Sequence, residues 1–145
     1  MLLTIINGPN LNLLGKREPS VYGSASFESY LEKLQQQFPA VQFEYFQSNI
    51  EGELIDAIQK YGVSTAGIII NPGGYTHTSV ALGDAIAAIT TPVIEVHISN
   101  TAARETFRHI SHVSAKCAGT IIGLGLTGYA LAVQWFVEQN SSSVN

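Results

Sequence analysis

The sequence predicts an α/β fold in which a doubly wound parallel sheet is flanked by helices. Five short apolar runs rich in Ile, Val, Phe or Thr alternate with segments that have helical spacing. Runs such as Ile68-Ile69-Ile70 show no in-out alternation, as expected for parallel strands covered on both faces. Five strands fit the flavodoxin-like order better than the six-stranded dinucleotide-binding fold.

The five apolar runs define the expected strands. They cover residues 2–6, 41–46, 66–70, 92–96 and 120–124. Each run is short and is bounded by Gly, Pro, Asn or a helical segment, which is typical of strands in a parallel sheet.

Helices are expected in the intervals between these strands. The first should cover 27–38 and the second 50–61, because apolar residues recur there every three or four positions, and Gly62 is placed to end the second. The third should begin near Thr78-Ser79, where a hydroxyl can cap free amides, and should end before Pro92. The last should cover 127–139, and the serine-rich tail 141–145 should be frayed.

One segment is too long for a simple connection. Residues 8–24 separate the first strand from the first helix, where two to six residues are usual. Overlong ordered loops are often lids or binding loops, so we expect a lid at about 15–24. The chain of 145 residues should otherwise form one domain over 1–140.

The composition is poor in charge. Only 12% of residues are charged while 46% are hydrophobic, about half the ~25% charge of an ordinary soluble domain. This deficit predicts a homo-oligomer that hides apolar surface against its own copies. Seven basic residues, including the three arginines Arg17, Arg104 and Arg108, make no basic stripe, so a nucleic-acid partner is not expected.

Cys117 is the only cysteine, which favours a reducing, cytoplasmic compartment and a small buried hydrophobic role for this thiol. The apolar start of the chain lacks a basic region and is cut at Asn7-Gly8-Pro9, so it predicts a buried strand rather than an export signal. No stretch reaches the ~20 apolar residues of a membrane span.

Polar residues follow three of the expected strands. Because ligands bind beyond the carboxyl ends of strands in open α/β sheets, a common rim is predicted there. Each residue alone also has a structural interpretation, since asparagines favour turns and single histidines are usually structural. The residues expected to converge are Asn10, Asn71, His77, His97 and Ser99.

Familiar catalytic motifs are missing. There is no G-x-S-x-G, no P-loop, and no G-x-G-x-x-G after the first strand, which argues against serine hydrolysis, nucleotide hydrolysis and dinucleotide binding. His109-x-x-His112 has no third metal ligand and is interpreted as a solvated helix face. Neither a metal nor a cofactor is expected.

Acid-base chemistry remains as the main possibility. On an extended strand, Glu95 and His97 share a face, so the carboxylate can orient the imidazole and stabilise its charged form. A surface Glu-His pair explains the same spacing equally well. Tyr22 could act as a base if Arg17 favours its phenolate, but the residues alone favour a packing role for Tyr22.

Four motifs resemble the type II 3-dehydroquinate dehydratases, in order and spacing, from about residue 3 to 138. They are Asn7-Gly-Pro-Asn-Leu-Asn-Leu-Leu-Gly15, Arg17-Glu-Pro-x-x-Tyr-Gly23, Asn71-Pro-Gly-Gly-Tyr-Thr-His-Thr-Ser79 and Glu95-Val-His-Ile-Ser-Asn100. The resemblance implies a flavodoxin-like fold. It also implies anti elimination of water from 3-dehydroquinate through an enolate, giving 3-dehydroshikimate in the shikimate pathway or in quinate catabolism.

The resemblance also implies residue roles. Tyr22 would be the base for the C2 proton, with Arg17 favouring its phenolate, and His97 would be the acid for the C1 hydroxyl, held by Glu95. Asn10 would position a water at the enolate oxygen. The substrate-binding set would be Asn71 and the amides of Ile98 and Ser99 for the carboxylate, His77 and Arg108 for ring hydroxyls, and Asp84 for the substrate of a neighbouring subunit.

Two further implications concern assembly. The family forms trimers grouped into dodecamers, which would account for the scarcity of surface charge. Gly83 stands where the family often has Arg, so the pairing around Asp84 is in doubt.

The alternative function is a non-catalytic, flavodoxin-like module that binds a small anion near Gly73-Gly74 at a helix N-terminus.

Overall fold

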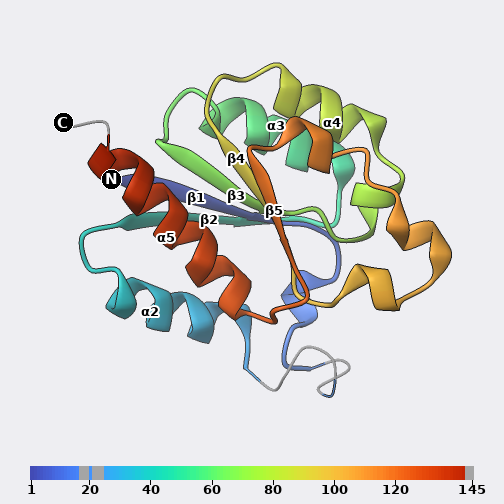
Figure 1. The fold of residues 1–145 in the computed structure, drawn as a ribbon, viewed down its shortest axis with the longest axis horizontal. Helices are drawn as coiled ribbons and strands as arrows, with labels where there is room; N and C mark the ends of the chain where they lie inside the picture. The colour runs from blue at the N-terminus through green and yellow to red at the C-terminus, as the bar shows by residue number, and fades with distance from the viewer. Residues whose placement is uncertain (17–19, 21–24, 143–145) are drawn as a thin grey trace.

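The computed structural model describes residues 1–16, 20 and 25–142 and contains one parallel sheet of five strands (Figure 1). The strand order is β2-β1-β3-β4-β5, and every neighbouring pair is parallel. This is the flavodoxin-like order, so the predicted fold class is confirmed. The strands are β1 (Leu2–Asn7), β2 (Gln42–Gln47), β3 (Gly67–Asn71), β4 (Val93–His97) and β5 (Gly119–Ile122).

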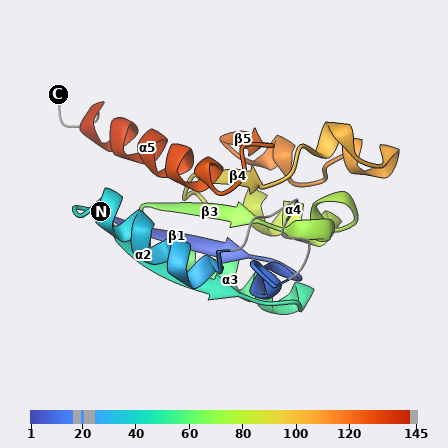
Figure 2. The same cartoon turned by 90° about the horizontal axis from the view of Figure 1, so that it is seen from below.

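Helices cover both faces of the sheet. α2 (Phe27–Gln37) and α5 (Thr127–Ser142) lie on one face, and α3 (Glu51–Tyr61) and α4 (Val80–Ala87) lie on the other (Figure 2). Each face has its own apolar core. Ile69 packs into the core under α2 and α5, whereas Ile68 and Ile70 pack into the core under α3 and α4. The three isoleucines therefore alternate between two buried faces, which explains why the sequence shows no alternation of polarity.

Serine hydroxyls cap the starts of α2 and α4. The Ser79 side chain accepts a hydrogen bond from Leu82 N (3.0 Å), so α4 begins where the sequence predicts. The predicted end of the last helix was wrong, because α5 continues to Ser142. The Ser141 and Ser142 hydroxyls donate to the carbonyls of Val137 and Glu138, which holds residues predicted to be frayed in the last helical turn. Residues 143–145 lie outside the described residues.

The connection between β4 and β5 is the largest departure from the predicted elements. Its residues form three short 3₁₀ helices, Thr101–Ala103, Thr106–His109 and Ser114–Lys116. His109 and His112 do not form a helix face. The His112 amide donates to Thr76 O (2.8 Å), and an extended backbone there meets the loop after β3.

Gly83 is the residue of α4 that allows the β4–β5 connection to pack closely against this helix. A Cβ atom at Gly83 would lie 2.3 Å from the His112 carbonyl oxygen, which is a forbidden contact. The glycine therefore has a packing role within this chain.

The expected lid falls mostly on residues 17–19 and 21–24, which lie outside the described residues. No helix among residues 1–16, 20 and 25–142 is long and apolar enough to cross a membrane.

Replacing Gly83 with Ala should destabilise the protein by about 1–3 kcal/mol, because the new methyl group overlaps a backbone oxygen. The matched control is Gly52→Ala in α3, where a Cβ atom would meet nothing within 4 Å. Helix propensity alone should make the control neutral or stabilising by up to about 1 kcal/mol. Urea unfolding of both variants measures the difference, and equal stability of the two would contradict the packing role of Gly83.

Candidate active site

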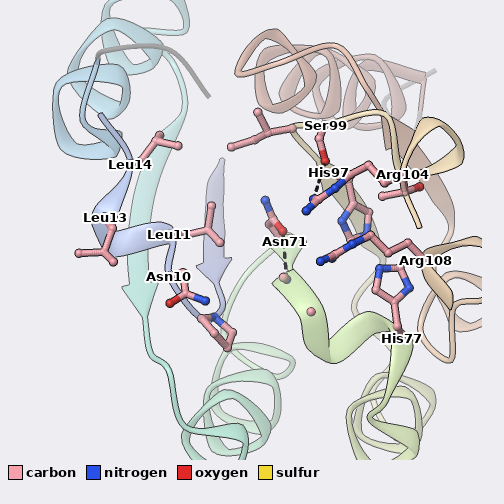
Figure 3. Close-up of a pocket in the computed structure, with 15 residues that line it drawn as sticks. Asn10, Leu11, Leu13, Leu14, Asn71, His77, His97, Ser99, Arg104 and Arg108 are labelled. Carbon is pink, nitrogen blue, oxygen red and sulfur yellow. Dashed lines mark hydrogen bonds between the residues drawn. The ribbon is translucent and has the colours of Figure 1, made fainter. Parts of the chain in front are cut away.

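A pocket opens at the carboxyl ends of β1, β3 and β4 (Figure 3). Its volume is about 240 Å³. All five residues expected to converge there line the pocket, so the predicted convergence is confirmed. The described lining residues are Pro9, Asn10, Leu11, Leu13, Leu14, Asn71, Gly73, Gly74, His77, His97, Ile98, Ser99, Thr101, Arg104 and Arg108. They include two arginines and two histidines but no carboxylate, which suits an anionic ligand.

Two glycine-containing loops form one wall of the pocket. The Gly8 amide donates to Asn71 O (2.7 Å), which ties the loop after β1 to the loop after β3. A Cβ atom at Gly8 would lie 2.5 Å from Pro72 O, and Gly73 has a φ of +60°, where glycine is strongly favoured. Asn10 also has a positive φ, 69°, which Asn tolerates better than most residues. The motif residues therefore fix the backbone of this wall.

A buried network of polar groups supports the floor. The Tyr129 hydroxyl donates to Asn7 Oδ1 (2.8 Å) and accepts from Asn71 Nδ2 (3.1 Å). Asn71 Oδ1 accepts from the Gly73 amide (3.1 Å). Two hydrogen bonds thus fix the Asn71 side chain, which leaves its second Nδ2 hydrogen for a ligand. Burial raises the pKa of the Tyr129 hydroxyl, so it stays a neutral donor.

His97 and Glu95 form a buried pair on β4. The distance from His97 Nε2 to Glu95 Oε1 is 2.6 Å, and Glu95 is 0% exposed. The predicted shared face is confirmed, and the alternative of a surface pair is wrong. Since a carboxylate only accepts, the Nε2 proton points at Glu95, and Nδ1 is the ring nitrogen left to exchange a proton with a ligand.

Glu95 has further partners behind the ring. The hydroxyl of Thr76 donates to Oε1, and that of Ser114 donates to Oε2. Burial raises the pKa of the Glu95 carboxyl, but the hydrogen bonds from His97, Ser114 and Thr76 outweigh it and hold the pKa below its usual range. Glu95 is therefore an ionised group that can stabilise a charged His97.

His77 lies beside His97, with ring centroids 6.3 Å apart. Its Nδ1–H donates to Ile110 O (2.7 Å), which assigns the proton to Nδ1 and leaves Nε2 as an acceptor. Burial lowers the pKa of His77, the Ile110 carbonyl opposes that effect, and the positive charges of His97 and Arg108 add to the lowering. His77 is thus a neutral group whose Nε2 can accept a hydrogen bond.

Two arginines reach the pocket from the 3₁₀ region. Arg108 Nε donates to Glu105 Oε2 (2.7 Å), and its guanidinium lies over the Phe107 ring. Arg104 Nη1 donates to Ser99 Oγ (3.1 Å). The resemblance assigned a role to Arg108 but not to Arg104, although the scarcity of arginine in the chain was a usable signal.

The structure does not place every predicted site residue. Arg17 and Tyr22 lie outside the described residues. Asp84 is exposed on α4 and does not line the pocket of its own chain. Burial, with a smaller effect of the Glu95 charge, raises the pKa of the partly buried Cys117 thiol to about 12, which makes it unreactive. No group of three potential metal ligands occurs in residues 1–16, 20 and 25–142.

Sequence reasoning missed the groups that support the site. Asn7 and Tyr129 form the hydrogen-bonded floor of the pocket, and Thr76 and Ser114 donate to Glu95. None of the four was predicted as a site residue. Asn7 and Thr76 do stand inside the quoted motifs, which is the one signal that pointed to them. Tyr129 and Ser114 are distant in sequence, and only the fold brings them to the site.

Comparison with known proteins identifies the family. A family model described as "Dehydroquinase class II" matches residues 1–137. The chain belongs to the class II dehydroquinase family. A 3-dehydroquinate dehydratase of Exiguobacterium is 52% identical over 139 residues, which is 95% of each chain, and that of Bacillus licheniformis is 50% identical over 96% of this chain and 97% of its own.

Solved structures of class II dehydroquinases agree with this membership. The type II dehydroquinase of Butyrivibrio crossotus superimposes with a TM-score of 0.89 at 45% identity, over 94% of this chain and 97% of its own. That of Propionibacterium acnes gives 0.88 at 40% identity, over 92% and 94%. Nearly the whole chain, including the residues that line the pocket, therefore has the fold of the class II dehydroquinases.

Replacing Tyr129 with Phe should destabilise the protein by about 1–3 kcal/mol, because Asn7 Oδ1 loses its donor and one Nδ2 hydrogen of Asn71 loses its acceptor. The control is Tyr75→Phe, which removes a more accessible hydroxyl that donates to Asn49 O (2.9 Å). Thermal unfolding compares the two. A Tyr129 variant as stable as the Tyr75 variant would contradict the importance of the buried network.

Protonation of Glu95 should weaken folding. A carboxyl whose pKa is lowered in the folded state adds stability above its usual value of 4.5, and that stability is lost as pH falls through the lower, folded pKa. Melting temperatures of the wild type and of Glu95→Gln should therefore differ most at neutral pH and converge under acid conditions. A difference that is constant with pH would rule out an ionised Glu95.

Proposed function

We propose that the chain is a 3-dehydroquinate dehydratase of type II, a hydro-lyase that converts 3-dehydroquinate to 3-dehydroshikimate. Membership of the dehydroquinase family carries the proposal, because relatives near 50% identity over almost the whole chain bear that name. His97 lines a cationic pocket and is held from behind by the ionised Glu95, so it can supply the acid that such an elimination needs.

The net reaction removes one water, made up of a proton from C2 and a hydroxyl group from C1, and Tyr22 and His97 recover their starting protonation by exchange with solvent. Tyr22, with Arg17 favouring its phenolate, takes the C2 proton to give an enolate. The charged His97 then gives its Nδ1 proton to the departing hydroxyl, while Glu95 compensates the imidazolium charge. Asn10 positions a water at the enolate oxygen. No metal, cofactor or covalent intermediate takes part in this scheme.

Substrate contacts follow from the lining of the pocket. Asn71 and the amides of Ile98 and Ser99 hold the substrate carboxylate, which the two arginines attract. His77 accepts a hydrogen bond through Nε2, and the neighbouring Arg108 donates, so both bind ring hydroxyls (Figure 3). This scheme places the product in the shikimate pathway or in quinate catabolism.

A non-catalytic anion-binding module is the alternative. It would place the anion near Gly73-Gly74 at the start of α4. That helix start is already occupied, since the Ser79 hydroxyl caps Leu82 N and itself donates to the Glu51 carboxylate. A simple anion site also has no use for a buried carboxylate behind His97. These observations favour the enzyme.

We further propose that the enzyme is a cytoplasmic homododecamer of four trimers. Several large apolar side chains are exposed on the described part of the single chain, and three of them, Ile122, Leu124 and Leu131, belong to β5, its following turn and α5. β5 is also an edge strand. In such an assembly Asp84, exposed on α4, would reach a neighbouring site. Light scattering of the purified protein tests the mass.

Purified wild-type protein should convert 3-dehydroquinate to its conjugated enone, measured by ultraviolet absorbance. Tyr22→Phe and His97→Ala should each lower kcat by at least about 100-fold, because each removes one proton-transfer group. Circular dichroism should show an unchanged fold in both variants.

The assay also separates the alternatives. An anion-binding module would bind the substrate without turnover, and a purely structural subunit would show no change in melting temperature with it. Near-normal turnover by Tyr22→Phe would show that another group is the base.

A further inference from the structure

We propose that Thr76 and Ser114 are positioning residues that keep the negative charge on Glu95 and so keep the catalytic proton on His97. The expected effect on kcat rests on the proposed function. The expected effect on the ionisation of Glu95 rests only on the hydrogen bonds around its carboxylate. Neither hydroxyl lines the main pocket, and neither contacts the substrate in the scheme above.

The two hydroxyls complete the environment of a fully buried carboxylate. Oε1 accepts from His97 and Thr76, and Oε2 accepts from Ser114. The donors come from three separate segments, namely β4, the 3₁₀ helix Gly73–His77 and the 3₁₀ helix Ser114–Lys116. A buried carboxylate without such partners would take up a proton, because burial favours its neutral form.

The direction of each hydrogen bond is determined by proton counting. Ser111 Oγ lies 3.1 Å from Thr76 Oγ1 and accepts from the amides of Val113 (3.0 Å) and Ser114 (2.9 Å). Since these two amides fill both acceptor positions of the Ser111 hydroxyl, Ser111 must donate to Thr76, and the single Thr76 proton is then directed to Glu95. Two backbone amides therefore orient Ser111, which orients Thr76 toward Glu95. This polarity favours an ionised carboxylate, whose oxygens only accept.

Few titratable groups surround the carboxylate. Three titratable groups of the described residues interact with the Glu95 charge: His97 on β4, His77 in the loop after β3 and Cys117 in the β4–β5 connection. His77 carries no charge near neutral pH, and the thiol stays protonated, so neither can replace a lost hydroxyl. If Thr76 and Ser114 are removed, the proton shared by the pair moves toward Glu95, and His97 loses its acid proton.

The test uses Thr76→Val, which keeps the shape of the side chain and excludes a replacing water, alone and combined with Ser114→Ala. Thr76→Ser restores the hydroxyl. The matched control is Thr91→Val, which removes another partly buried hydroxyl, bonded to Gly62 O (2.6 Å) at the opposite end of β4. Carboxyl ¹³C spectra, with the Glu95 signal assigned from Glu95→Gln, follow the titration of Glu95 directly.

We expect Thr76→Val to raise the pH at which Glu95 titrates by roughly one pH unit, and the double variant to raise it further. kcat should fall about tenfold in Thr76→Val, with KM changed less than about twofold, and Thr76→Ser should recover most of it. Thr91→Val should lose stability but keep the wild-type titration and kcat.

An unshifted Glu95 titration in Thr76→Val would overturn the inference. So would equal losses of kcat in Thr76→Val and Thr91→Val, since these would indicate a general effect on folding. The single variant decides the question if the double variant does not fold. If the wild type does not convert 3-dehydroquinate, the proposed function fails, while the Glu95 titration still tests whether the two hydroxyls hold the charge.

Discussion

The rest of the site depends on one buried charge, the Glu95 carboxylate. Moving an isolated carboxylate out of water costs several kcal/mol or more, so the chain must supply donors wherever it buries one. Here the donors are His97, Thr76 and Ser114. Because they come from different segments, satisfying the charge also fixes the loop after β3 and the β4–β5 connection relative to β4.

The same requirement explains the irregular β4–β5 connection. His112 N donates to Thr76 O and His77 Nδ1 donates to Ile110 O, so residues 110–114 run along the loop after β3. A continuous α-helix would use these backbone groups internally and would carry Ser114 away from Glu95. The short 3₁₀ turns, and the close approach of His112 to Gly83, are thus the local form that the buried carboxylate and its partners demand.

Local patterns in the sequence predicted the five strands, the four long helices and the residues of the rim, because these depend on periodicity, caps and the ends of strands. The same patterns failed at the β4–β5 connection, where polar spacing resembles a helix but contacts between distant segments determine the backbone. Tyr129 and Ser114 could not be predicted for a related reason. A tyrosine on an apolar helix stripe and a serine in a polar segment look ordinary until the fold places them against Asn71 and Glu95.

The ion pairs around the pocket differ in strength according to their burial. Glu95 is buried, so its interaction with His97 is weakly screened and holds the ring in one orientation and protonation pattern. Glu105 is exposed, and the ion pairs that it makes with Arg104 (3.8 Å) and Arg108 (2.7 Å) are worth little in water. An anion entering the pocket can therefore draw the Arg108 guanidinium from Glu105 at small cost, whereas it cannot separate His97 from Glu95. In the proposed mechanism the proton donor is thus held rigidly while Arg108 can adjust, because Glu95 is buried and Glu105 is exposed.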